Sequence, residues 1–253
     1  MDHIDLKKLV SYLDTYLNTT VFEDNAINGV QVANQGHISK IATAVSASLE
    51  TIEMAAALGA QALIVHHGIL KKQDSSLAIV DTKYRKIALL MQHNIALICY
   101  HLPLDAHREL GNNWKAARDL GLTELQPFLE LNKQHIGVIG SVSPTSFQDF
   151  KANVERYYGR TAQEVKVKNT VTRVAILSGK ADRCLKDAAA AGADCFITGT
   201  HDEPVWDTAY EEGISFLSLG HYTTEIVGPK ALAEHLQTIF AIPCQFIKTK
   251  NPF

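Results

Sequence analysis

The stretch Ala62-Leu63-Ile64-Val65-His66-His67-Gly68 places two adjacent histidines directly after an apolar run that is typical of a buried strand. Neighbouring side chains of an extended chain point to opposite faces, so the two imidazoles can reach two different points. This arrangement suits two metal ions held side by side. The simpler alternative for a histidine doublet is an ordinary loop or surface position, and the rest of the chain has to decide between the two.

The residues on either side of the doublet predict a β-α-β unit. A strand over 41–45 leads into a helix over 49–58, which Ser46 or Ser48 would cap and Gly59 would end, and the strand over 62–65 follows. Strands connected in this way are parallel, and the connection is right-handed. The same reasoning predicts helices over 5–17, 83–94 and 111–120, a turn into a short strand over 28–32, a strand over 95–100 and a polar loop over 71–81.

The second half of the sequence repeats the order of the first. Residues 55–64 align with 188–197, the strand at 41–45 with 174–177, and the strand at 95–100 with 214–219. The strands at 95–100 and 214–219 are each followed by a histidine-containing turn, a glycine and a helix. We interpret this order as an internal duplication and expect an α/β protein whose two similar halves cover 1–125 and 126–253. Strands over 136–142 and 165–174 should flank a helix over 146–158, which Ser143-Pro144-Thr145 would start.

Side chains that can bind metal follow the predicted strands, where sites form in open α/β sheets. His221 and Glu225 are four residues apart and share one face if a helix begins near 221. Pro103 stiffens the turn that presents Asp105. Each feature alone also fits a solvated pair or a plain turn, but their joint placement favours a metal site. The candidates are His66, His67, His101, Asp105, His107, His201, His221 and Glu225.

The composition limits the classes of function. With 253 residues, 46% of them apolar, the chain can form one large domain or two small ones. A net charge of -3 gives no basic excess, which makes nucleic-acid binding unlikely. No apolar run approaches ~18 residues, so no membrane span is expected. The N-terminus lacks the apolar core of a signal peptide, and the four cysteines form no CxxC pair, so we expect a reduced, cytoplasmic protein.

Three stretches together carry a resemblance: His66-His67-Gly68, the segment 100–107 (Tyr-His-Leu-Pro-Leu-Asp-Ala-His) and the segment 220–225 (Gly-His-Tyr-Thr-Thr-Glu). They resemble the signature stretches of the NIF3-like family, also known as GTP cyclohydrolase 1 type 2 homologs, in its short bacterial form. The resemblance covers nearly the whole chain. It implies a NIF3-like fold of two duplicated α/β halves with a dinuclear metal site between them, and assembly as a toroidal homohexamer.

The resemblance also assigns residues. One metal would take His66, Asp105 and Glu225, and the other would take His67, His221 and Glu225, with Glu225 as the bridge. His101 looks like the family's pocket histidine beside the metals. Imidazole and carboxylate ligands suit zinc, iron, manganese, cobalt or nickel better than magnesium, and the ligand set does not choose among the five.

Two neighbouring metals can share a water molecule and lower its pKa toward neutrality. The expected function is therefore a dinuclear metal-dependent hydrolase that uses a metal-bridging hydroxide on a nucleotide or related heterocycle, GTP among them. His101 would be the catalytic proton carrier. A metal-dependent phosphoesterase and a metal-binding interaction protein without catalysis are the alternatives. Lys71, Lys72 and Arg108 are candidate phosphate partners, although solvated surface charge is the simpler interpretation, as a loop position is for His201.

Overall fold

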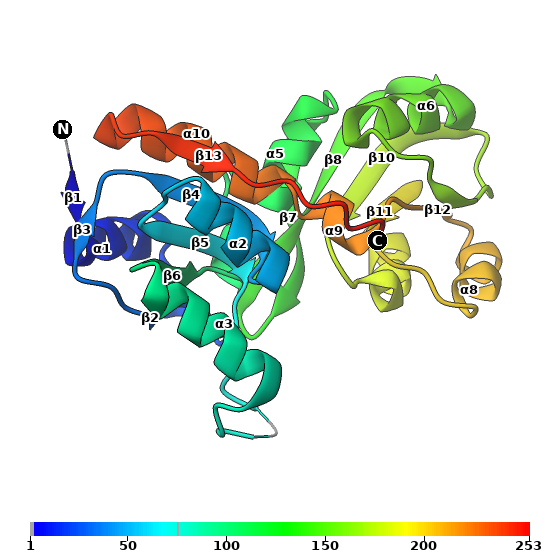
Figure 1. Ribbon diagram of the computed structural model, residues 1–253. Helices are drawn as coiled ribbons and strands as arrows, with labels where there is room; N and C mark the ends of the chain where they lie inside the picture. Colours follow the sequence, from blue (N-terminus) through cyan, green and yellow to red (C-terminus); the bar gives the residue numbers. More distant parts are fainter. Residues whose placement is uncertain (1–2, 75) are drawn as a thin grey trace. The chain divides into compact units, whose positions relative to one another are not determined.

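The computed structural model describes residues 3–74 and 76–253, and these residues form two compact units (Figure 1). Unit 1 contains the chain up to Leu104 together with Gly228–Lys250, and unit 2 contains Asp105–Val227 with Asn251–Phe253. Each unit is therefore formed by two separate segments of the chain. Three residues lie outside the described part of the chain. They are Met1 and Asp2 at the N-terminus, where no signal peptide is expected, and Ser75 of the expected loop over 71–81.

Unit 1 is built on a five-stranded sheet. Its strand order is β13 (Cys244–Phe246), β4 (Ile41–Ser46), β5 (Ala62–His67), β6 (Ala96–Cys99) and β2 (Gly29–Val32). The first four strands are parallel, and β2 runs antiparallel to β6. A two-stranded sheet pairs β1 (Ile4–Asp5) with β3 (His37–Ile38). The predicted parallel pairing of the strands on either side of the first crossover helix is confirmed.

The helices of unit 1 include the three that were predicted over 5–17, 49–58 and 83–94. They are α1 (Leu6–Tyr16), the 3-10 turn η1 (Thr19–Val21), α2 (Leu49–Ala57), α3 (Asp81–Gln92) and α10 (Val227–Phe240). The Ser48 hydroxyl accepts a hydrogen bond from the Thr51 amide and so caps α2, as predicted. Asp5 caps α1 in the same way, and Leu6, Leu9 and Leu13 bury the apolar face of that helix.

Unit 2 is built on a six-stranded mixed sheet. Its strand order is β7 (Thr123–Leu131), β8 (Gln134–Ser146), β10 (Thr170–Leu177), β11 (Cys195–Thr198), β12 (Ser215–Ser218) and β9 (Gln163–Val165). Only the β10-β11-β12 pairs are parallel. The helices are α5 (Asn112–Asp119), α6 (Phe147–Tyr158), η2 (Asp182–Cys184), α7 (Leu185–Ala190), α8 (Val205–Glu212) and α9 (His221–Thr224), and α4 (Leu102–Ala106) runs from unit 1 into unit 2.

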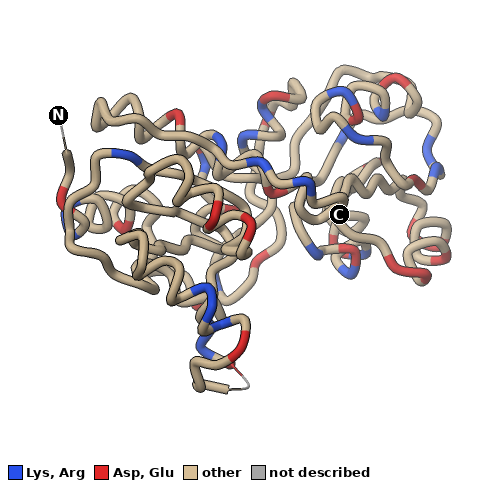
Figure 2. Tube along the Cα trace, in the orientation of Figure 1, with Lys and Arg blue, Asp and Glu red and all other residues tan. Residues whose placement is uncertain are grey.

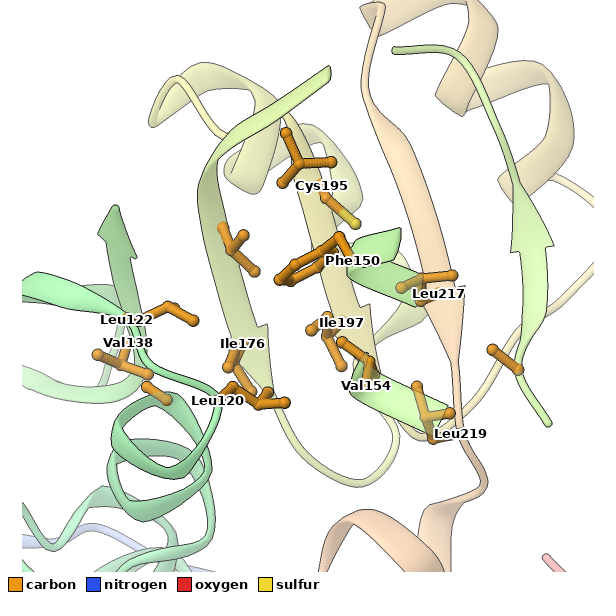
Figure 3. Close-up of a cluster of buried hydrophobic side chains, with 14 of the residues drawn as sticks. Leu120, Leu122, Val138, Phe150, Val154, Ile176, Cys195, Ile197, Leu217 and Leu219 are labelled. Carbon is orange, nitrogen blue, oxygen red and sulfur yellow. The ribbon is translucent and has the colours of Figure 1, made fainter. Parts of the chain in front are cut away.

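One face of the unit 2 sheet is covered by α6. Ile176, Ile197 and Leu217 project from the three parallel strands into a buried apolar cluster (Figure 3). Phe150 and Val154 of α6 pack into the same cluster. Every position of β11 and β12 is buried, including the polar residues Thr198, Ser215 and Ser218.

Two predictions about the segment between the repeats are wrong. Residues 165–174 form two strands, because β9 ends at Val165 and pairs with β12, whereas β10 begins at Thr170 beside β8. The Ser215 hydroxyl accepts hydrogen bonds from the amides of Val167 and Lys168 and so holds the link between them. Ser143-Pro144-Thr145 lies inside β8 and does not start a helix. The cap of α6 is Ser146, whose hydroxyl accepts from the Asp149 amide.

Charges are mixed along both units. Both basic and acidic residues are distributed along the trace of each unit (Figure 2). Among the helices of residues 3–74 and 76–253, none is long and apolar enough to cross a membrane.

Candidate metal centre

In unit 1 the histidine doublet is part of β5 rather than of the turn after it. His67 pairs with Ser46 of β4, so the strand continues through both histidines before Gly68. The His66 side chain is fully buried, and its Nδ1 lies 3.2 Å from the carbonyl oxygen of Tyr100. Because a carbonyl can only accept, Nδ1 is the donor and the lone pair of the neutral ring is on Nε2. A backbone carbonyl behind the ring is typical of metal-binding histidines.

A third imidazole joins the doublet. The ring nitrogens of His66, His67 and His101 that could bind a metal all lie within 4.8 Å of one another. The ring centre of His101 is 4.8 Å from that of His66 and 5.6 Å from that of His67. Three imidazoles at this spacing repel one another when protonated, whereas their neutral forms provide nitrogen ligands for a transition metal. The donor set therefore fits such an ion.

Asp24 fixes the orientation of His101. The Nδ1 atom of His101 lies 2.9 Å from Asp24 Oδ1. The Asp24 carboxylate also accepts from the amides of Ala26 and Leu102, and the side-chain oxygen of Asn28 accepts from the His101 amide. Burial acts to raise the pKa of Asp24, but the hydrogen bond and charge of His101, together with those two amides, outweigh burial and hold that pKa well below its ordinary value.

In unit 2 the pair His221 and Glu225 takes the predicted arrangement. Gly220, with φ +97°, precedes the short helix α9, and Glu225 follows it. The His221 Nε2 atom lies 3.1 Å from Glu225 Oε1, so the two side chains share one face. Glu225 is only 3% exposed. A β-carbon at Gly179, where φ is +70°, would collide with this carboxylate, so the glycine makes room for it.

Asp105 is held by two neighbours within unit 2. Its Oδ1 accepts from the Asn112 side-chain amide at 2.8 Å and from the Ser178 hydroxyl at 3.1 Å. Asp105 lies on the short helix α4 and not on an open turn, with Pro103 near the start of that helix, where a missing amide hydrogen costs nothing. The side chain is 6% exposed.

The remaining candidates have local roles. The Nδ1 atom of His107 accepts from the amides of Glu109 and Leu110, and the Arg108 guanidinium lies 5.0 Å from the centre of the Trp114 ring. Lys71 and Lys72 are exposed. His201 contacts Ser218 at the end of β12.

Sequence reasoning missed Asp24, Asn112 and Ser178. Asp24 follows no apolar strand, and it is 77 residues from His101, so no spacing rule connects the two. Asn112 gave a signal that could have been used, because it is seven residues from Asp105 on the next helix. Ser178 follows β10 directly, so its position at a strand end is the signal in the sequence that could have indicated it.

These features define an α/β protein with histidine and glutamate clusters at its strand ends that could hold a metal ion. The family described as Duf34/NIF3 (NGG1p interacting factor 3) matches residues 4–252, and the chain belongs to this family. It is 46% identical to the GTP cyclohydrolase 1 type 2 homolog of Chlamydia pneumoniae over 253 residues, which cover 99% of this chain and 100% of that protein.

Solved structures show the same fold. The structure of protein ybgI, described as of unknown function, matches with a TM-score of 0.93 and 34% identity, over 99% of this chain and 100% of that one. The crystal structure of TTHA1606 from Thermus thermophilus matches with a TM-score of 0.90 and 32% identity, again over 99% and 100%. The resemblance to this family is therefore confirmed across the chain.

Proposed function

We propose that this protein is a metal-dependent hydrolase of the GTP cyclohydrolase 1 type 2 kind that uses two divalent transition-metal ions. The observation that carries the proposal is that the ligand nitrogens of His66, His67 and His101 lie within 4.8 Å of one another in unit 1, where the Tyr100 carbonyl oxygen orients His66. The name of the C. pneumoniae relative supports the choice of reaction.

The ligand assignment follows the family resemblance. One ion would be held by His66, Asp105 and Glu225, and the other by His67, His221 and Glu225. Within each unit the chemistry supports these roles. His66 has the tautomer that leaves Nε2 as the ligand atom, and Asp105 and Glu225 are buried carboxylates whose surroundings hold them in place.

Two bound divalent ions would supply the Lewis acidity that makes a water molecule nucleophilic near neutral pH. The protein supplies the proton carrier. Because Asp24 engages Nδ1 of His101, the other ring nitrogen is the one that takes a proton from water and returns it to the leaving group. With a guanine nucleotide, water adds at C8, a C8–N bond of the base opens, and the ring nitrogen receives the proton.

The test is direct. Metal-loaded protein is incubated with GTP while the ultraviolet spectrum and free phosphate are followed together. Ring opening changes the spectrum and supports the proposal. Phosphate release with an unchanged spectrum would contradict the cyclohydrolase-type reaction and would identify the protein as a phosphoesterase. If metal is retained but no nucleotide or phosphoester in a panel is turned over, the hydrolase proposal is wrong and the protein is a metal-binding protein that acts through partners.

We further propose that the halves 1–125 and 126–253 arose by duplication and that the protein is a toroidal homohexamer. Matching sets of three parallel strands, β4-β5-β6 and β10-β11-β12, support the duplication. The family resemblance alone supports the hexamer. Light scattering should give a mass six times the 27.8 kDa of one chain, and a monomer or dimer mass would contradict this assembly.

A further inference from the structure

The carbonyl group that orients His66 belongs to a peptide group that is held on both sides. Tyr100 follows β6, and its amide donates to the carbonyl oxygen of Val65 at 2.9 Å. Its carbonyl oxygen lies 3.2 Å from Nδ1 of His66. The amide of the same peptide group, which is that of His101, donates to the side-chain oxygen of Asn28 at 2.9 Å. The orientation of this one peptide group therefore decides how the His66 ring is held.

The side chain of Tyr100 supplies a further anchor for the same residue. Tyr100 is fully buried, and its hydroxyl donates to Oδ1 of Asp14 at 2.9 Å. Asp14 is 86 residues away in the sequence, on α1. A buried hydroxyl without a partner costs free energy, so the bond to Asp14 favours one position of the phenol. Helix α1 is thereby tied to the residue that supports His66.

Asp14 is suited to the role of an anchor. It follows Leu13, which is buried on the apolar face of α1, and its Oδ1 also accepts from the Thr19 hydroxyl at 3.3 Å. The Asp14 side chain is itself half-buried. A hydrogen bond to a carboxylate is stronger than one to a neutral acceptor, so the charge of Asp14 strengthens its hold on the phenol.

We propose that Asp14 is a positioning residue for His66. Through the phenol of Tyr100 it fixes the peptide group between Tyr100 and His101, whose carbonyl oxygen keeps the proton of His66 on Nδ1 and leaves Nε2 for a metal ion. That His66 binds a metal ion rests on the proposed function, whereas the effect of Asp14 on the His66 ring of the metal-free protein does not.

A matched pair of tyrosine variants separates positioning from stability. Tyr100→Phe removes the bond to Asp14 in unit 1, and Tyr157→Phe removes a bond of the same length, 2.9 Å, to Asp119 in unit 2. Both variants should lower the Tm, because each loses one hydrogen bond to a carboxylate. Zinc affinity is measured by competition with a chelator. Tyr100→Phe should weaken one of the two ions about 10-fold, the lower end of the range for groups that support a metal ligand, and Tyr157→Phe should weaken neither.

Variants of Asp14 test the anchor itself. Asp14→Ala should reproduce the loss of zinc affinity in Tyr100→Phe, and the double variant should lose no more than either single one, since all three remove the same bond. Asp14→Asn keeps a side-chain oxygen that can accept from the phenol, so it should retain most of the affinity. Circular dichroism of each variant verifies folding. Additive losses in the double variant, or a loss in Tyr157→Phe equal to that in Tyr100→Phe, would overturn the proposal.

A measurement without metal follows His66 directly. After treatment of the full chain with a chelator, nuclear magnetic resonance with isotope-labelled histidine detects the proton on Nδ1 of His66. We expect this signal in the wild type and in Tyr157→Phe, and we expect it to shift or to be lost by exchange with water in Tyr100→Phe and Asp14→Ala. An unchanged signal in Tyr100→Phe would overturn the proposal.

The two measurements also distinguish this proposal from the proposed function. A changed His66 signal with unchanged zinc affinity would support the positioning of the ring and would contradict only the role of His66 as a metal ligand. Lack of GTP turnover would count against the hydrolase alone, because neither measurement depends on catalysis.

Discussion

Strand β5 of unit 1 and strand β11 of unit 2 have the same place in similar frames but end in different residues. Each is the middle one of three parallel strands that follow one another along the chain with helices between them. β5 continues through His66 and His67, whereas β11 ends at Thr198 and is followed by Gly199. The end of β5 therefore carries two imidazole side chains, whereas the glycine after β11 has no side chain.

The difference between β5 and β11 separates the effect of the strand arrangement from the effect of the side chains. The parallel strands determine where a site can form, because their carboxyl ends meet at one edge of the sheet. The side chains at that edge determine what binds there. In unit 1 they are three imidazoles within 4.8 Å, which suit a metal ion. In unit 2 Gly199 and Gly220 line a cavity of about 240 Å³, and among the described residues no imidazole doublet lies there.

The largest expected effect is the loss of both metals in Glu225→Gln. If Glu225 bridges the ions, this nearly isosteric change removes one charged ligand from each of them, and metal content should fall from two ions per chain to none. Elemental analysis after purification without added metal measures it. The exposed Glu211→Gln in the same unit is the control and should retain both ions.

His66→Ala tests the same assignment from unit 1. His66 is proposed to bind only one ion, so about one ion per chain should remain. Two ions retained in Glu225→Gln would refute the bridge. If Glu225→Gln loses one ion and His66→Ala loses two, then His66 is needed for both ions and Glu225 binds only one.

Both strand ends were predictable in position because each follows a fully buried strand. The run 62–65 and its counterpart 195–197 in the repeat are apolar and buried, as a central parallel strand requires, and the sequence shows this apolar character directly. The sequence limited the cap of α2 to Ser46 or Ser48, and the Ser48 hydroxyl is the one that accepts from the Thr51 amide.

The supports of the site were not predictable, since they depend on how distant segments meet. Asp24 lies in a polar loop that returns to the end of β6, and only the fold brings it to His101. Strand β7 was missed because it is an outer strand of its sheet, and only Phe128 among its residues is buried, so it shows no regular apolar pattern. β9 and β10 were merged because the link between them is held by Ser215 from another strand.

A smaller effect is expected from Asp24→Asn, which keeps the size of the side chain and removes its charge. If His101 carries the proton, metal content should be unchanged and kcat should fall about 10- to 100-fold, against about 100- to 10,000-fold for His101→Ala. Loss of a metal from His101→Ala would identify His101 as a ligand instead. The exposed Asp207→Asn is the control for loss of an acidic charge.

Asp24→Asn should also change stability with a defined pH dependence. The pKa of Asp24 is lower in the folded protein than its unfolded value of about 3.9. The stabilising contribution of its carboxylate is therefore fully present above about pH 4 and is lost as pH falls toward the folded pKa. Thermal unfolding should show a lower Tm for Asp24→Asn at pH 7 and a shrinking difference from the wild type below about pH 4. A difference that grows with acid would contradict this role.

The smallest effect is expected from a matched pair of glycine changes in unit 2. Gly179 and Gly192 have φ of +70° and +79°, but a β-carbon would meet Glu225 at Gly179 and nothing within 4 Å at Gly192. Gly192→Ala should lower the free energy of unfolding by about 1–2 kcal/mol through backbone strain alone and leave metal affinity unchanged. Gly179→Ala should add to the same strain a roughly tenfold weaker metal affinity, because it displaces the Glu225 carboxylate. Equal metal affinity in the two variants would show that Gly179 does not position Glu225 and that only its backbone conformation matters.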